Sequence, residues 1–139
     1  MNNVDIKNYI LAWKKIIFET ENRSFHHNLF YKNNVYWLIF LFISDATYNK
    51  ENISYEKLCQ IISQNTASRS TIYRILNNFL LEHLIFKKNS KTDSRVKYYY
   101  LSSTGKTIFE NLIKNELDVF SSIKKNSVAE EYFKRENWV

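Results

Sequence analysis

The near absence of glycine and proline limits what this chain can fold into more than any other feature of its sequence. The 139 residues include 1 Gly and no Pro. A sandwich or barrel of many short strands needs a turn roughly every 8–12 residues, and these two residue types make many of the tight turns. A glycine-rich phosphate loop or a dinucleotide fingerprint needs two or three glycines at fixed spacing. The composition therefore argues against these classes and predicts a mostly α protein with one ordinary core.

Cysteine content and apolar runs narrow the class further. The single cysteine, Cys59, excludes an internal disulfide framework and a cysteine-based zinc site. Residues 1–15 are amphipathic and lack the layout of a signal peptide. The longest apolar run, 35–43, is far shorter than the roughly 18 residues that suggest a membrane span. We expect one cytoplasmic domain over residues 1–139, with no membrane partner and no cofactor.

The excess positive charge lies in one stretch of the chain. The formal net charge is +6, from 20 Lys and Arg against 14 Asp and Glu. Between Arg69 and Lys106 stand eight basic residues and only two acidic ones, Glu82 and Asp93, so the rest of the chain is balanced. Binding to nucleic acid requires such clustering, although a solvated lysine-rich surface has the same composition.

Apolar periodicity and capping residues predict the elements. Ser54, Ser68 and Ser102 stand where a hydroxyl can cap a following helix. The helix after Ser54 is expected to bury Leu58, Ile61 and Ile62, with Cys59 also buried. Two β-prone runs on either side of a charged polar tip predict a hairpin, 84–88 with 96–101. The remaining predicted helices are 4–18, 35–48, one opened by Ser68, one from Ser102 to about Lys124, and 128–138.

The helix opened by Ser68 has two different faces. Its packing stripe consists of Ile72, Ile75, Leu76, Phe79 and Leu80. The opposite face has hydrogen-bonding side chains at the same spacing: Ser70, Tyr73, Arg74 and Asn77. A purely structural helix has no need of that second set, so this face is a candidate binding surface.

A helix–turn–helix followed at once by a basic hairpin is a winged helix, whose second helix fits a major groove about 12 Å wide. Residues 53–112 resemble the DNA-binding domain of MarR-type transcriptional regulators. The strongest matches are SRSTIYR at 68–74, DSR at 93–95 and LSSTG at 101–105. Two positions depart from the family pattern. His83 stands where glycine is usual, at a position that often needs a positive φ, and Leu81 stands where a polar residue is more usual.

The resemblance implies a homodimer on a palindromic operator of double-stranded DNA. Residues 35–103 would form the winged helix-turn-helix DNA-binding region, and 1–34 with 104–139 the helical dimerisation region. Independently, the amphipathic segments that flank the winged helix need a surface to bury against. A second copy supplies one, and so does folding back onto the same chain.

In this interpretation the recognition helix, 68–83, enters the major groove. Ser70, Thr71, Tyr73 and Arg74 would face the bases, where an arginine can read guanine bidentately. Arg69 is expected to contact a phosphate, and Asn77 to touch only the backbone. Two alternatives stay open: Thr71 bonds only the backbone of the first helical turn, or Tyr73 lies across a phosphate.

The wing, 87–97, would reach the minor groove. Narrow A·T-rich minor grooves attract an inserted arginine, which makes Arg95 the strongest candidate, and Asp93 would hold its guanidinium. The alternative is a surface ion pair that only stabilises the loop. Nearby lysines would attract phosphates without reading sequence: Lys87, Lys88, Lys91 and Lys97.

Other functions find less support in the sequence. His26-His27 lacks the partners of a metal site, and Cys59 would need an exposed, low-pKa thiol to sense oxidants. No nucleophile stands with a base, so we expect no enzyme. A winged helix that binds DNA or protein with little sequence specificity remains the alternative function. The resemblance also implies a small lipophilic or phenolic effector; the aromatic residues that would line its pocket, or simply fill the core, are Trp13, Phe18, Phe25, Phe30, Tyr36 and Trp37.

Overall fold

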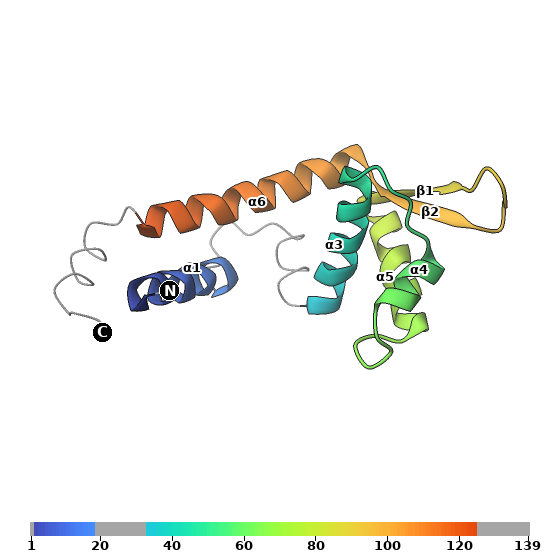
Figure 1. The fold of residues 1–139 in the computed structure, drawn as a ribbon. Coiled ribbons are helices and arrows are strands. Elements are labelled where there is room, and N and C mark those ends of the chain that lie inside the picture. The colour runs from blue at the N-terminus through green and yellow to red at the C-terminus, as the bar shows by residue number, and fades with distance from the viewer. Residues whose placement is uncertain (1, 19–32, 125–139) are drawn as a thin grey trace. The chain divides into compact units, whose positions relative to one another are not determined.

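The computed structural model describes residues 2–18 and 33–124 (Figure 1). The chain divides into two compact units, Met1–Ser24 with Glu110–Val139, and Phe25–Phe109. The described helices are α1 (Asn3–Phe18), α3 (Asn34–Tyr48), α4 (Tyr55–Ile61), α5 (Arg69–Leu81) and α6 (Ser103–Lys124), and the strands are β1 (Ile85–Asn89) and β2 (Lys97–Leu101). This confirms the expected mostly α fold with a helix–turn–helix and one hairpin. The expected helix at 128–138 and the histidine pair His26-His27 lie outside the described residues.

Serine caps begin three of the helices, as predicted. Ser54, Ser68 and Ser102 each accept a hydrogen bond from the backbone N–H three residues further on, at 3.1, 3.2 and 2.9 Å. Each bond satisfies one of the N–H groups that the first turn of a helix leaves without a partner. The caps therefore determine where α4, α5 and α6 begin.

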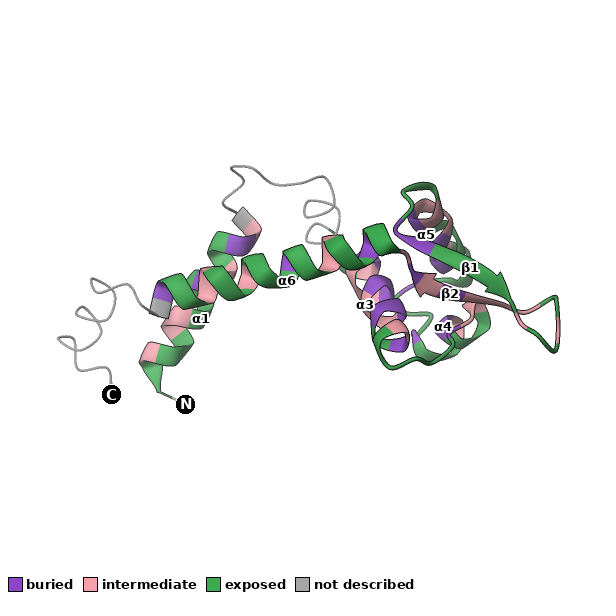
Figure 2. Cartoon of the chain, turned by 90° about the horizontal axis from the view of Figure 1, so that it is seen from above, coloured by how far each residue is buried: buried purple, intermediate pink, exposed green. Residues whose placement is uncertain are grey.

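Apolar side chains from α3, α4, α5 and the hairpin form the core of the second unit (Figure 2). Phe40 of α3 meets Phe79 of α5 edge to face, with ring centroids 5.6 Å apart, and Tyr36 meets Phe79 in the same way at 5.5 Å. The predicted packing stripe of α5 is buried except for Leu80, which is half-buried. The fully buried side chains include Ile39, Phe40, Ile43, Leu58, Ile72, Ile75, Leu76, Phe79, Leu84 and Leu101.

Two predicted core residues of α4 are not in the core. Ile61 is 42% exposed, because α4 ends there and the next residue, Ile62, is extended (φ −85°, ψ 121°). This change of backbone buries Ile62 beside Leu58 in place of Ile61. Cys59 is half-buried rather than buried.

The hairpin is a regular antiparallel pair whose base is bonded to the helices. Its register runs from Ile85↔Leu101 to Asn89↔Lys97. The N–H of Tyr99 donates to the carbonyl of Ile53 at 2.9 Å, and the α4 cap Ser54 forms an isolated antiparallel bridge with Tyr98 of β2. The N–H of Leu101 donates to the Thr47 hydroxyl at 3.0 Å. These bonds orient the wing on the winged-helix core.

The helix α5 ends in a left-handed turn without glycine. His83 has φ 58°, which confirms the expected positive φ at this position. The N–H groups of His83 and Leu84 donate to the carbonyls of Leu80 and Phe79 at 3.1 and 3.0 Å. This pair of bonds is the Schellman arrangement that usually places a glycine at the left-handed residue.

The described part of the first unit contains α1 and residues 110–124 of α6. Tyr9, Trp13 and Phe120 form a ring cluster, with centroids 5.7 to 6.3 Å apart. Large apolar side chains of both helices remain exposed: Ile6, Tyr9, Ile10, Leu11, Ile113 and Leu117. No described helix is long and apolar enough to cross a membrane.

Candidate nucleic-acid interface

The polar face of α5 lies on the surface, opposite the buried stripe (Figure 2). Ser70, Tyr73 and Arg74 are exposed, with Tyr73 at 54%, and Thr71 and Asn77 are half-buried. Leu81 continues this face at the C-terminal end of the helix and is 76% exposed. The structure thus brings Ser70, Tyr73, Arg74 and Asn77 together on one face of α5.

Hydroxyl groups fill the first turn of α5. The Ser68 hydroxyl donates to Thr71 Oγ1 at 2.9 Å and lies 3.1 Å from the Ser70 hydroxyl. It also accepts from the Thr71 N–H as the helix cap. Thr71 therefore contacts the cap through its hydroxyl and its N–H, whereas Ser70 remains exposed at the helix start.

Arg69, the first residue of α5, is held by the first two residues of α4. Its guanidinium forms an ion pair with Glu56 at 2.5 Å and lies 5.3 Å from the centre of the Tyr55 ring. The Tyr55 hydroxyl donates to the Arg69 carbonyl at 3.0 Å. The bond to Glu56 raises the pKa of Arg69, and partial burial raises the pKa of the Tyr55 phenol.

Sequence reasoning missed Tyr55 and Glu56 as members of this surface. Glu56 occupies the first turn of α4, where a negative charge interacts favourably with the helix dipole. Its presence there needs no partner on another helix. No local pattern links it to a residue thirteen positions away.

Tyr73 and Arg74 are the side chains at the middle of the exposed face. The Tyr73 ring packs edge to face against Tyr55, with centroids 5.8 Å apart. Arg74 is exposed and has no ion pair within 2–18 and 33–124. Of these two candidate base-reading side chains, Tyr73 thus packs against a neighbouring ring, and Arg74 is exposed.

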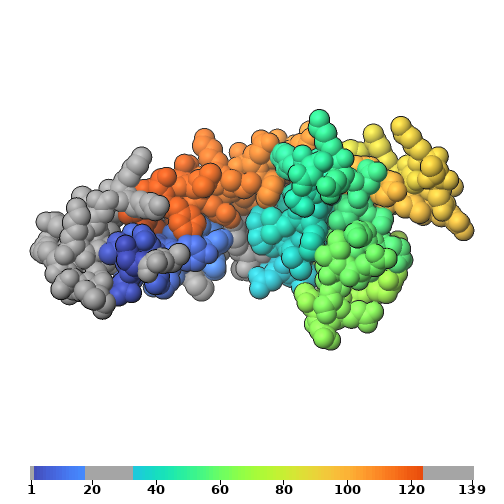
Figure 3. Space-filling model, in the orientation of Figure 1, coloured from blue at the N-terminus to red at the C-terminus, as the bar shows by residue number. Residues whose placement is uncertain are grey.

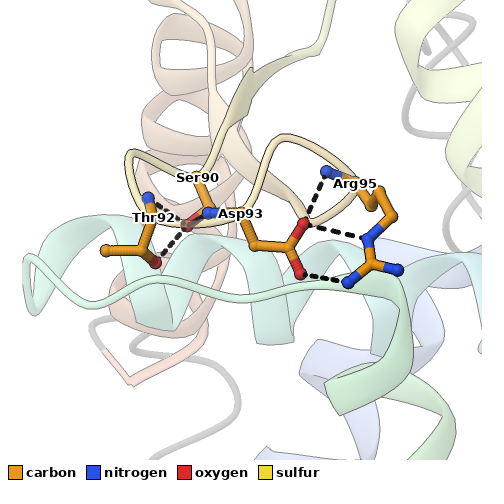
Figure 4. Close-up of polar contacts among 4 residues, drawn as sticks. All are labelled: Ser90, Thr92, Asp93 and Arg95. Carbon is orange, nitrogen blue, oxygen red and sulfur yellow. Dashed lines mark hydrogen bonds and ion pairs between the residues drawn. The ribbon is translucent and has the colours of Figure 1, made fainter.

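At the wing tip Asp93 holds Arg95 (Figure 4). Arg95 Nε donates to Asp93 Oδ1 at 3.1 Å, one terminal nitrogen donates to Oδ2 at 3.2 Å, and the Arg95 N–H donates to Oδ1 at 3.0 Å. The arginine side chain is nonetheless 90% exposed. These bonds hold the pKa of Asp93 below its usual value. The Ser90 hydroxyl accepts from the N–H groups of Thr92 and Asp93, which shapes the tip around the carboxylate.

Basic side chains continue along the hairpin. Lys87, Lys88 and Lys91 are exposed, and the Lys88 ammonium lies 5.7 Å from the centre of the Phe86 ring. Lys97 is half-buried and donates to Asn89 Oδ1 at 2.7 Å. The wing, yellow in Figure 3, projects beyond α4 and α5 (green). A projecting arm with this charge can approach the phosphates of a polyanion.

Only some of the residues considered for a metal or effector site lie in the described part of the chain. No group of three His, Cys, Asp or Glu side chains in that part of the chain could hold a metal ion. Tyr36 and Trp37, two of the aromatic residues considered for an effector pocket, contact Phe79 and Phe40 in the core of the second unit. Trp13 belongs to the ring cluster of the first unit. The Phe18 side chain and residues Phe25 and Phe30 lie outside the described part.

Comparison with known proteins shows the fold. No family model and no curated protein matches the sequence. The chain is similar to a MarR mutant from E. coli complexed with operator DNA, with a TM-score of 0.53, 14% identity, and coverage of 96% of this chain and 86% of that one. For FabT from Streptococcus pneumoniae in complex with DNA, the TM-score is 0.55 and the identity 17%, with coverage of 95% of this chain and 83% of that one. For a MarR-like transcriptional regulator from Thermotoga maritima, the TM-score is 0.53 and the identity 13%, with coverage of 98% of this chain and 94% of that one. This chain therefore has the winged-helix fold of MarR-type transcriptional regulators.

Proposed function

We propose that this protein is a sequence-specific regulator of transcription that binds double-stranded DNA as a homodimer on a palindromic operator. In this proposal α5 lies in the major groove and the wing tip in the minor groove. The observation that carries it is the pairing of an exposed polar face on α5 with an arginine held, yet 90% exposed, at the tip of a basic hairpin. Both features lie in the stretch that holds all the excess charge.

The charge and the geometry support different parts of the interaction. Contacts between lysine or arginine and phosphate supply essentially all of non-specific affinity for DNA and a large share of specific affinity, whereas sequence is read by side chains at base edges. The exposed lysines of the wing suit the first role, and Tyr73 and Arg74 suit the second. The complexes of MarR and FabT with DNA support the proposal by analogy of fold.

Exposed apolar side chains of α1 and α6 support the homodimer. Single exposed apolar residues are common on monomers, but here they recur along two amphipathic helices. A two-fold dimer would present two winged helices to half-sites about one turn of DNA apart, or roughly 34–36 Å. This function requires no catalytic group, and we place it in the cytoplasm, where DNA would be reached. A small lipophilic or phenolic effector stays a prediction.

Selection of bound duplexes from a random library, followed by a salt titration on the selected sequence, tests the function. Recovery of one inverted-repeat motif, bound about a thousandfold better than random DNA, is the expected result. Salt-sensitive binding without a motif would instead favour the module with little sequence specificity. Absence of binding at low salt would overturn the proposal.

A further inference from the structure

We propose that Tyr55 and Glu56 are positioning residues for DNA binding, which hold Arg69 at the start of α5 in the orientation that meets a phosphate. This inference rests on the proposed function and concerns the same surface. The two residues open α4 and make three contacts with Arg69, which opens α5. They are the ion pair of Glu56, the ring contact of Tyr55 and the hydrogen bond from the Tyr55 hydroxyl to the Arg69 carbonyl.

The contacts fix both the side chain and the backbone of Arg69. The hydrogen bond at 3.0 Å ties the backbone of the first residue of α5 to α4, so that the two helix starts move together. The ion pair at 2.5 Å fixes the direction of the guanidinium. A free arginine would lose its rotamer freedom on binding, and an arginine that is already held avoids that loss.

The held arginine still has donors for a ligand. A guanidinium carries five N–H donors, and the bond to Glu56 uses one terminal nitrogen. The side chains of Arg69 and Glu56 are 49% and 64% exposed, so solvent and ligands reach the pair. Arg69 also lies at the N-terminal end of a 13-residue helix, where free backbone N–H groups and the helix dipole favour an anion. A phosphate at this end of α5 would meet the arginine and the helix together.

Tyr55 links this arrangement to a second candidate contact. Its ring lies 5.3 Å from the Arg69 guanidinium and packs edge to face against Tyr73, which is one turn further along α5. One side chain of α4 thus touches the expected phosphate contact and one of the expected base contacts. Loss of this ring would affect both.

Substitution of Glu56 provides a test, because charge repulsion and positioning of Arg69 predict opposite changes in DNA affinity. A carboxylate close to DNA repels phosphates, so simple removal of its charge should strengthen binding. If Glu56 positions Arg69, the substitution Glu56→Gln should weaken binding despite the more favourable net charge. Because the pair is exposed, we expect the loss of affinity to be about two- to fivefold.

The experiment measures the affinity of the full chain for its selected duplex by fluorescence anisotropy over a series of salt concentrations. The variants are Glu56→Gln, Arg69→Ala, the double variant, and Tyr55→Phe, which keeps the ring and removes the hydroxyl. Arg69→Ala should reduce the salt slope by about one. The double variant should bind as well as Arg69→Ala or slightly better, because without Arg69 only the repulsion between Glu56 and the phosphates remains. Tyr55→Phe should weaken binding in the same direction as Glu56→Gln.

Glu82→Gln is the matched control, because it removes one exposed negative charge at the C-cap of the same helix. It should leave affinity unchanged or raise it. Thermal unfolding of every variant separates a loss of positioning from a loss of fold. The inference would be overturned if Glu56→Gln bound DNA as tightly as the wild type or more tightly. It would also be overturned if Glu56→Gln lowered the affinity by the same factor in the Arg69→Ala background. A wild-type chain that binds no DNA would overturn the proposed function itself.

Discussion

Gly105, in the first turn of α6, lies directly against the backbone of Leu84. A Cβ atom at Gly105 would come within 2.0 Å of the Leu84 carbonyl oxygen and 3.0 Å of its carbon. That oxygen accepts a hydrogen bond from the Ser102 N–H at 3.0 Å, and the Ser102 hydroxyl donates to the neighbouring carbonyl of His83 at 2.5 Å. The start of α6 is therefore bonded to the turn that ends the proposed recognition helix.

Substitution of this glycine should destabilise the protein. Gly105→Ala places a methyl group against backbone that other bonds hold in place, so either α6 or the turn must shift. We expect the free energy of unfolding to fall by about 1–3 kcal/mol, as in other overpacked sites. Urea denaturation followed by circular dichroism measures the change. Ser103→Ala, at an exposed position in the same turn, is the control and should stay within about 0.5 kcal/mol of wild type.

The left-handed residue His83 predicts a substitution that stabilises. A non-glycine residue at positive φ costs about 1–2 kcal/mol, and glycine at the same position avoids this cost. Part of the gain is offset because glycine has more conformational freedom to lose from the unfolded chain. His83→Gly should therefore raise the free energy of unfolding by up to about 1 kcal/mol, and the carbonyl at position 83 would still accept from the Ser102 hydroxyl. Glu82→Gly, at the adjacent residue with φ −82°, should lower it instead. Two changes of the same sign would contradict the argument.

Local signals in the sequence were sufficient for most of the fold. The serine caps of α4, α5 and α6 bond within three residues, and the buried stripe of α5 repeats at helical spacing, so both could be predicted. Ile61 shows where this reasoning fails. Apolar periodicity predicted a helix that includes Ile62. In the structure α4 ends at Ile61 and the backbone at Ile62 is in the β conformation, so that Ile62 is buried and Ile61 is exposed.

Contacts between distant residues could not be predicted. Asp93 and Arg95 are two residues apart, so their pairing follows from the chain itself, and the sequence predicted it. Glu56 and Arg69 are thirteen residues apart, and only the packing of α4 against α5 brings them together. Contacts within the candidate interface were therefore predicted where they are local and missed where they depend on helix packing.

The bond between Asp93 and Arg95 predicts the behaviour of the wing at low pH. Since the folded pKa of Asp93 is lowered, its stabilising contribution is present above the unfolded value of about 3.9 and is lost as the pH falls through the folded pKa. NMR titration of the Asp93 carboxyl should give a midpoint below about 3.9 in the wild type. In Arg95→Ala the midpoint should rise, because the side-chain bonds are the main cause of the shift. An unchanged midpoint would show that the two side chains are separate in solution.

Arg74 and Lys88 should contribute to DNA binding in different ways. Arg74, exposed at the middle of the α5 face, is expected to read a base, so Arg74→Ala should relax the preference at one position of the motif and cost about 1–3 kcal/mol there. Lys88→Ala should weaken binding to all sequences alike and reduce the salt slope by about one. Competition with single-base variants of the selected duplex measures both effects. A uniform loss in both variants would favour the module with little sequence specificity.

The proposed homodimer can be tested on α6 without DNA. Leu117 is 60% exposed within the first unit, on a helix whose Ile113 is also exposed, and such side chains are expected to lie in the interface between copies. Leu117→Glu would place a charge there, and burying an unpaired carboxylate is strongly unfavourable. Sedimentation equilibrium should give about twice the 16.8 kDa chain mass for the wild type and a shift toward one chain mass for the variant. Leu81→Glu makes the same chemical change at a more exposed leucine of α5 and should leave the dimer intact. If the wild type sediments as a single chain, or if both variants keep its mass, this face of α6 is not the interface between copies.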